Sequence, residues 1–351
     1  MQVNAPRAAA IAAPRPDKPT QPAMTADLAA SRAGDVARLF NEIVRLTPSA
    51  SRYGNDALIA AAAYSSGTSA SEAATLFRDI SGRTPSRSSY LNDALLTASA
   101  LQARENGSTA AQTFSDVTSR TPSRSDYGND ALLAAASLLT KNSGAHSATV
   151  FNDVSARTPR QSDYFNDAIL AAGAVQAGTT ADTAVRTFDA VRERTPTSSS
   201  HRNDALLAAG AMEGRTDGVV AAKTFADVSS RTGSSSYDND AVVASAAVAA
   251  GVSGPAAATT FNDITKWTPS SSPYGNDALI AAGAIRAGAS STTAGAAFNE
   301  IARLTPRNSP YINDAVLTIA ALGTPMTGTT LAAVSAALGD AEKKDNEEPQ
   351  P

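Results

Sequence analysis

The chain has 351 residues, a formal net charge of −4 and no cysteine. Without thiols it can form neither a disulfide nor a thiolate metal site. Its negative charge disfavours a nucleic-acid backbone as the partner, without excluding one. No apolar run approaches the ~18 residues that a membrane-spanning helix needs, so the sequence predicts no membrane span.

Residues 1–26 form a proline-rich segment that we expect to be disordered. The segment carries Arg7 and Arg15 but no acidic residue before Asp17. Its short apolar run ends at a proline, unlike the longer run of a Sec signal peptide. A plain disordered tail, an organellar transit peptide and a bacterial export signal all fit this composition.

From residue 27 onward the sequence repeats itself. The dipeptide Asn-Asp recurs at steps of 37 residues, once of 36, beginning at Asn55, Asn92, Asn129, Asn166, Asn203, Asn239, Asn276 and Asn313. A phenylalanine recurs with it from Phe40 to Phe298, and Thr-Pro follows that phenylalanine in every copy except at Thr232. A fixed period of this length is the signature of a repeat protein.

Each repeat contains two helical patterns. The first follows Asn-Asp, and its apolar positions have the spacing of one helix face, as in Tyr127, Ala131, Ala134, Ala135 and Leu138. The second surrounds the repeated phenylalanine and ends at Thr-Pro, because proline cannot continue a helix. Each repeat is therefore predicted to be a pair of antiparallel helices.

A single hairpin cannot bury its apolar face, so neighbouring repeats must stack. We predict an all-α fold, an α-solenoid of eight hairpins of about 37 residues that forms one elongated domain over residues 27–340. Ser335 stands where a ninth phenylalanine would be, so residues 329–339 are interpreted as a C-terminal capping helix. The charged tail, residues 341–351, is expected to be disordered.

No catalytic, cofactor or metal site is expected, and we predict that the protein is not an enzyme. The two histidines occupy different positions of the repeat: His146 falls in a predicted loop, and His201 replaces the repeated tyrosine. Neither has the convergent partners that metal binding or nucleophilic catalysis requires.

Two ladders of identical residues accompany the repeat. The Asn-Asp ladder lines a groove in one interpretation. In the other, which its identity in every copy favours, it satisfies helix starts or joins repeats; it includes Asn92, Asp93, Asn129, Asp130, Asn166 and Asp167. The arginine ladder comprises Arg83, Arg120, Arg157, Arg194 and Arg231. Four of these arginines follow an aspartate by four residues, which favours a self-neutralised helix face over an RNA-binding stripe.

One position varies strongly between repeats. The residue between the repeated tyrosine and Asn-Asp is, in chain order, Gly54, Leu91, Gly128, Phe165, Arg202, Asp238, Gly275 and Ile312. Phe165, Arg202 and Asp238 are consecutive and chemically unlike one another. We predict that these three residues bind the partner; the alternative is neutral drift at an exposed position.

The repeat resembles the tetratricopeptide/pentatricopeptide class of helical hairpins. Residues 129–133 (Asn-Asp-Ala-Leu-Leu), followed by Gly144, Ala148, Phe151 and Pro159, are similar to the pentatricopeptide order of Asn, aliphatics, Gly, Ala, aromatic and Pro. The resemblance implies a scaffold that binds a protein partner, or alternatively an RNA-binding protein. The Ala-rich array behind a proline-rich N-terminus is also similar in style to type III secretion effectors of plant-associated bacteria. That similarity implies secretion into a host cell and a host protein as the partner; otherwise a cytoplasmic location is expected.

Overall fold

The computed structural model describes residues 24–233 and 235–347, with side chains up to residue 340. In this part of the chain every regular element is an α-helix, which confirms the all-α prediction. None of the helices within these ranges combines the length and hydropathy needed to cross a bilayer. Most of the expected N-terminal segment, residues 1–23 of 1–26, lies outside the described residues.

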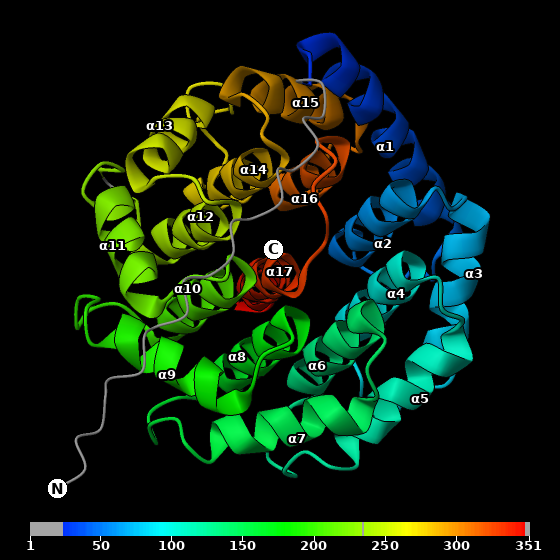
Figure 1. Ribbon diagram of the computed structural model, residues 1–351. Helices are drawn as coiled ribbons and strands as arrows, with labels where there is room; N and C mark the ends of the chain where they lie inside the picture. The colour runs from blue at the N-terminus through cyan, green and yellow to red at the C-terminus, as the bar shows by residue number, and fades with distance from the viewer. Residues whose placement is uncertain (1–23, 234, 348–351) are drawn as a thin grey trace, which may run out of the picture.

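The two helices of each repeat form two concentric rings (Figure 1). The outer ring contains the phenylalanine helices: α1 (Ala26–Leu46), α3 (Ala70–Ser81), α5 (Gly107–Thr118), α7 (Gly144–Ser155), α9 (Ala181–Arg192), α11 (Gly218–Ser229), α13 (Gly254–Ile264) and α15 (Ser291–Leu304). The inner ring contains the Asn-Asp helices: α2 (Tyr53–Ser66), α4 (Tyr90–Ala103), α6 (Tyr127–Thr140), α8 (Tyr164–Ala177), α10 (His201–Glu213), α12 (Tyr237–Ala250), α14 (Tyr274–Ala287) and α16 (Tyr311–Ala321).

The array closes on itself, so the expectation of an elongated solenoid is corrected to a closed ring. Helix α1 packs against α15, and α2 packs against α16 (Figure 1). Where the ring closes, Asn41 Nδ2 donates to the Leu304 carbonyl oxygen at 3.0 Å. Consecutive hairpins are joined in the same way, since Asn152 Nδ2 donates to the Arg120 carbonyl oxygen at 3.0 Å. The first and last hairpins therefore meet as any two neighbours do.

Closure follows from the wedge shape of the hairpin. The inner helices are rich in Ala and Gly and approach one another closely: a Cβ on Gly210 would lie 2.5 Å from the Ser245 carbonyl oxygen of the next inner helix. Apart from α1 and α15, neighbouring outer helices pack against each other less extensively than neighbouring inner helices do, although their first residues also approach closely, as Gly144 approaches the Thr113 carbonyl oxygen. Seven of the phenylalanines pack on the tyrosine of their own hairpin and Phe188 packs on His201, with ring centroids 5.7 to 6.2 Å apart. A stack of such wedges curves until its two ends meet.

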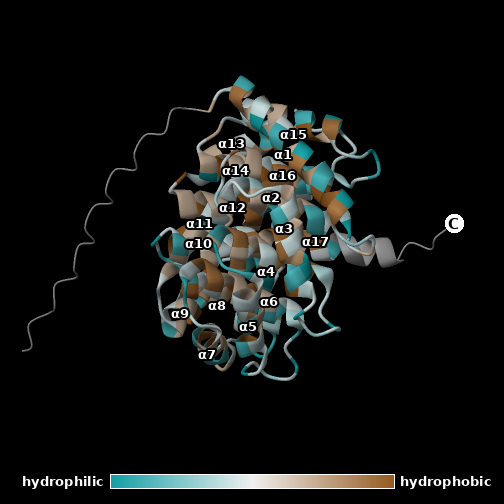
Figure 2. Ribbon diagram, turned by 90° about the vertical axis from the view of Figure 1, so that its right-hand side faces the viewer, coloured by the Kyte–Doolittle hydropathy of each residue, from teal (hydrophilic) through white to brown (hydrophobic). Residues whose placement is uncertain are grey.

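The last helix, α17 (Gly328–Glu347), lies in the centre of the ring and does not cap the end of a stack. It contacts the inner helices α4, α6, α8, α10, α14 and α16. It buries Leu331, Val334 and Leu338 against them, and its far end projects from one face of the ring (Figure 2). Helical backbone continues to Glu347, so the expected start of a disordered tail at residue 341 is not observed; residues 348–351 lie outside the described part.

Candidate functional site

The Asn-Asp ladder lies in the first turns of the inner helices, and each of its aspartates is at most 2% exposed. These aspartates accept hydrogen bonds from the Thr-Pro turn of their own hairpin: Thr195 Oγ1 donates to Asp204 at 2.7 Å, and Thr158 Oγ1 donates to Asp167 at 2.8 Å. The ladder thus fixes turns within a repeat. The side-chain caps of α4, α8, α10 and α12 come instead from the residue before the repeated tyrosine position, as from Ser200 at the start of α10.

The six ladder residues singled out from the sequence lie at the starts of α4, α6 and α8: Asn92, Asp93, Asn129, Asp130, Asn166 and Asp167. All six are buried, so they do not form an open groove. Burial raises the pKa of the three aspartates because desolvation outweighs the hydrogen bonds from serine and threonine hydroxyls. The same cause raises the pKa of Asp314 to about 7.

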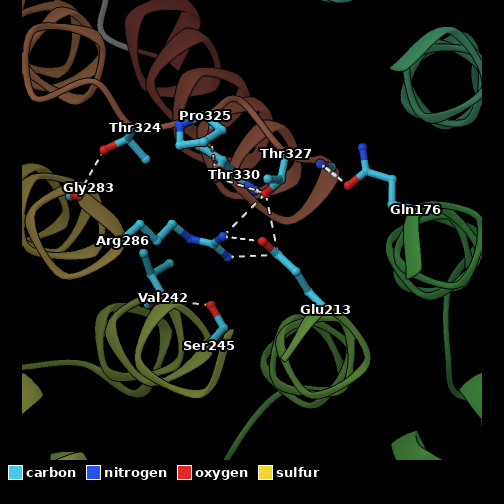
Figure 3. A network of polar contacts seen from close by, with 11 residues as sticks. Gln176, Glu213, Val242, Ser245, Gly283, Arg286, Thr324, Pro325, Thr327 and Thr330 are labelled. Carbon is cyan, nitrogen blue, oxygen red and sulfur yellow. Dashed lines mark hydrogen bonds and ion pairs between the residues drawn. The ribbon is translucent and has the colours of Figure 1, made fainter. Parts of the chain in front are cut away.

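Helix α17 is anchored where it enters the ring (Figure 3). Arg286 of α14 forms a two-pronged ion pair with Glu213 of α10, with Nη1–Oε1 and Nη2–Oε2 distances of 2.5 and 3.0 Å. The Arg286 side chain is only 8% exposed. Thr327, just before α17, hydrogen-bonds to both partners of this pair at 3.4 Å, and the Gly328 N–H donates to Gln176 Oε1. Charged and amide side chains of the inner ring therefore hold the start of α17.

Five of the eight variable residues lie next to α17 or line the cavity beside it, at the other end of this helix: Gly54, Arg202, Asp238, Gly275 and Ile312. A Cβ on Gly54 would lie 2.9 Å from Leu338 Cδ2 of α17. Arg202 Nη1 donates to Asp340 of α17 at 2.9 Å, and Arg202 Nη2 pairs with Asp238 at 3.2 Å. One helix cannot present the same side chains to eight surrounding helices. The residue type at the variable position therefore depends on which part of α17 lies opposite that repeat.

The structure brings together two of the three predicted partner-binding residues. Arg202 and Asp238 form an ion pair and line the same cavity. Phe165 is half-buried against the core and does not line that cavity. Asp340, the second carboxylate on Arg202, was missed from the sequence because it lies outside the repeat and has no counterpart in another copy.

A cavity of about 520 Å³ opens beside this ion pair. It lies between α17 and the first turns of α10, α12, α14 and α16, on the face of the ring that carries the Thr-Pro turns; we call this the Thr-Pro face. The space is left because α17 packs mainly against α4, α6, α8 and α10. Its lining includes the apolar side chains of Leu206, Val242 and Leu279, the amides of Asn203, Asn239 and Asn276, and the rings of Tyr274 and Tyr311.

The arginine ladder stands at the ends of the outer helices. Among the described residues, two of the four predicted i,i+4 ion pairs are present: Arg83 pairs with Asp79 at 2.8 Å, and Arg231 pairs with the aspartate four residues before it at 3.5 Å. Arg157 pairs instead with Asp182 of the next outer helix at 3.5 Å. Carboxylates thus neutralise these arginines both within and between repeats.

Three apolar residues interrupt the ladder on neighbouring outer helices. Leu46, Trp267 and Leu304, which we call the apolar arc, stand six residues after the repeated phenylalanine, where the other copies have arginine. Trp267 and Leu46 are 47% and 41% exposed. Trp267 is seated against Gly295 of α15, since a Cβ there would lie 2.5 Å from Trp267 Cβ. The other seven copies have alanine or valine in the register of Gly295.

The histidines occupy structural positions. His201 packs edge-on against Phe188 with ring centroids 6.0 Å apart, in the place of the repeated tyrosine. His146 lies in the first turn of α7 and not in a loop, because Ser143 caps that helix by accepting from the His146 N–H at 3.2 Å. Within the described ranges, no group of three or more His, Asp or Glu side chains is placed to hold a metal ion.

Comparison with known proteins gave no match, either to a protein-family model or to a curated protein. The tetratricopeptide/pentatricopeptide class therefore remains a resemblance of sequence pattern.

Proposed function

We propose that the protein is a non-enzymatic scaffold that binds a protein partner through the apolar arc on its outer ring. The exposed indole of Trp267 is the observation that carries this proposal. Tryptophan is the residue type most characteristic of binding hot spots, and a rigid aromatic side chain loses little entropy when it is covered.

Trp267 and Gly295, which are in contact, both differ from the residues at the corresponding positions of most other repeats. This paired difference supports a role in binding. Glycine inside a helix costs about 1 kcal/mol relative to alanine, and exposing half of an indole gains nothing for folding. An arginine over an alanine, as in other copies, serves folding at least as well. Retaining the pair gives the surface a fixed aromatic anchor that the other repeats lack.

The arc also continues across neighbouring helices. Leu304 ends α15, which lies between α13 and α1, so the three apolar side chains follow one another around the ring (Figure 1). We infer a partner whose surface has an apolar recess that receives the indole. An RNA partner is the weaker alternative, because carboxylates pair with ladder arginines and α17 fills the pore that the variable residues face.

Capture experiments with two variants test this proposal. Trp267→Arg restores the ladder residue and should abolish capture of the partner, whereas Arg231→Ala, one rung away, should retain it. Circular dichroism confirms that both variants are folded, and light scattering separates self-association from binding of another protein. Equal capture by wild type and Trp267→Arg would refute the proposal. RNA retention on filters that is lost as salt rises, and that does not depend on Trp267, would favour the alternative.

Secretion through a type III-like route, with a host protein as the partner, is part of the same proposal and is supported only by the composition of residues 1–26. Fusing these residues to a translocation reporter tests it separately.

A further inference from the structure

The cavity on the Thr-Pro face is separate from the apolar arc and has the properties of a small-molecule site. Its volume of about 520 Å³ lies within the range typical of ligand pockets. Its interior is lined by apolar side chains of the inner helices and by the small side chains of α17, namely Leu206, Val242, Leu279, Ala333, Ala336 and Ala337. The alanines of α17 leave the space that larger residues would fill.

The inner end of the cavity leads toward polar side chains that are already hydrogen-bonded within the protein, namely Ser245, Thr324 and Thr330. It is followed by a void of about 20 Å³ that shares Val242, Leu279 and Ala333 with it. Beyond these residues the void reaches Arg286, which is locked in its ion pair with Glu213. Most of the cavity wall is hydrocarbon, although the side-chain amides of Asn203, Asn239 and Asn276 also line it, and a wall of this kind suits an apolar chain.

The mouth of the cavity has an excess of negative charge. Among the described side chains, which end at Asp340, one guanidinium, that of Arg202, lies between the carboxylates of Asp238 and Asp340. Both carboxylates are about half exposed, at 50% and 49%. Tyr274, which is 47% exposed, lines the same cavity. A surplus carboxylate attracts a cation and repels an anion, and the face of an aromatic ring binds an ammonium group.

We propose that this cavity binds an amphiphilic organic cation, a ligand with one apolar chain and an ammonium head. The chain lies between α17 and the leucines and valine of the inner helices. The head remains at the mouth, near Asp238, Asp340 and Tyr274.

Three probes that share a ten-carbon chain test both halves of the proposal on the full-length protein. They are decyltrimethylammonium and decanoate, each titrated by calorimetry below its micelle concentration, and decanol, titrated below its solubility limit. The ammonium probe should bind most tightly and decanoate most weakly, with about tenfold or more between them. Binding of decanoate as tight as that of the ammonium probe overturns the assignment of a cationic ligand. No binding of any probe overturns the site.

A matched pair of variants locates the binding. Gly275 and Gly128 occupy the same position of the repeat, and a Cβ on either would lie 3.6 or 3.7 Å from the nearest asparagine oxygen. Only Gly275 lines the cavity, and Phe165 shows that a phenylalanine fits this position in another repeat. Gly275→Phe should weaken decyltrimethylammonium binding by about tenfold or more, while Gly128→Phe should leave it within about twofold. Equal effects of the two variants place the ligand elsewhere.

Two further variants distinguish the contribution of the ligand's apolar chain to binding from that of its ammonium head. Ala336→Leu fills the cavity from the α17 side and should weaken all bound probes together, which also covers the case in which Gly275→Phe fails to fold. Asp238→Asn removes the surplus negative charge. It should reduce the difference in affinity between the ammonium probe and decanol, while the affinity for decanol stays unchanged. An unchanged difference overturns the role of the carboxylates at the mouth.

Discussion

The buried carboxyl of Asp314 should make the ring more stable in mild acid than at neutral pH. An aspartate has an ordinary pKa of 3.8, and burial raises the pKa of Asp314 to about 7 in the folded state. Between these two values the folded protein holds a proton that the unfolded chain releases. The stabilisation is therefore complete below about pH 4, decreases as the pH rises, and is lost above about pH 7.

The size of the effect follows from the change in pKa. Each unit corresponds to about 1.4 kcal/mol, so the free energy of unfolding should decrease by about 4 kcal/mol across this window on account of Asp314. Asp277, whose pKa is raised to about 6, should contribute about 3 kcal/mol, and its loss should be complete near pH 6. Asp314→Asn keeps an oxygen that can accept from the Thr305 hydroxyl but cannot ionise. This variant should be more stable than wild type at about pH 8.

Urea unfolding followed by circular dichroism at several values between pH 5 and pH 8 measures this difference. Asp314→Asn should remove the fall in stability between about pH 6 and pH 7 and reduce the fall below pH 6, where Asp277 and Asp56, whose pKa values are raised to about 6, still contribute. Asp277→Asn should reduce only the part below about pH 6. Asp79→Asn, at an exposed ion pair, serves as the control and should leave the shape unchanged. A wild-type stability that does not fall over this range, or an Asp314→Asn profile parallel to wild type, would refute the reasoning.

Three more predictions concern the ring. Asn41→Ala and Asn152→Ala should each lower the free energy of unfolding by about 1 kcal/mol; a loss at Asn152 without one at Asn41 would indicate a ring that is open in solution. Arg286→Ala leaves a glutamate unpaired, so it should cost about 3 kcal/mol and expose α17 to limited proteolysis, whereas unchanged digestion would show that α17 is held by other contacts. Gly144→Ala places a Cβ 2.4 Å from a carbonyl oxygen of the preceding outer helix and should cost about 1 to 3 kcal/mol, measured by thermal unfolding; a neutral result would mean that the outer helices can shift.

The hairpins could be predicted from the sequence because helix periodicity and the Thr-Pro stops are local signals. Ring closure could not be predicted from the sequence, because neighbouring hairpins make the same contacts in an open stack and in a closed ring. Only the angle between wedges decides, and that angle depends on close approaches such as the one between Gly210 and Ser245. One signal of closure was present in the sequence. Asn41 and Asn152 occupy the same position of the repeat, and each donates to a carbonyl oxygen near the end of the preceding outer helix. In an open array Asn41 would have no preceding helix to which it could donate.

The candidate site could be predicted in part. The variable position identified Arg202 and Asp238, which lie together in the pore, but their neighbour is the chain's own Asp340. A helix outside the repeat cannot be placed by repeat logic, because no second copy shows where it packs. Trp267 carried a clear signal as the one tryptophan of the chain, but its seat on Gly295 is visible only in three dimensions.

The position of α17 also constrains the order in which this protein is made. A linear array can begin to fold at any repeat and extend from there. Here the earliest hairpin finds its second neighbour only after the eighth hairpin has been synthesised, and the pore receives its helix last of all. During translation the nascent chain is therefore an unfinished arc with two uncovered apolar edges and a hollow centre, the kind of species on which chaperones act. The pore is filled only after α17, which follows all eight hairpins in chain order, has left the ribosome.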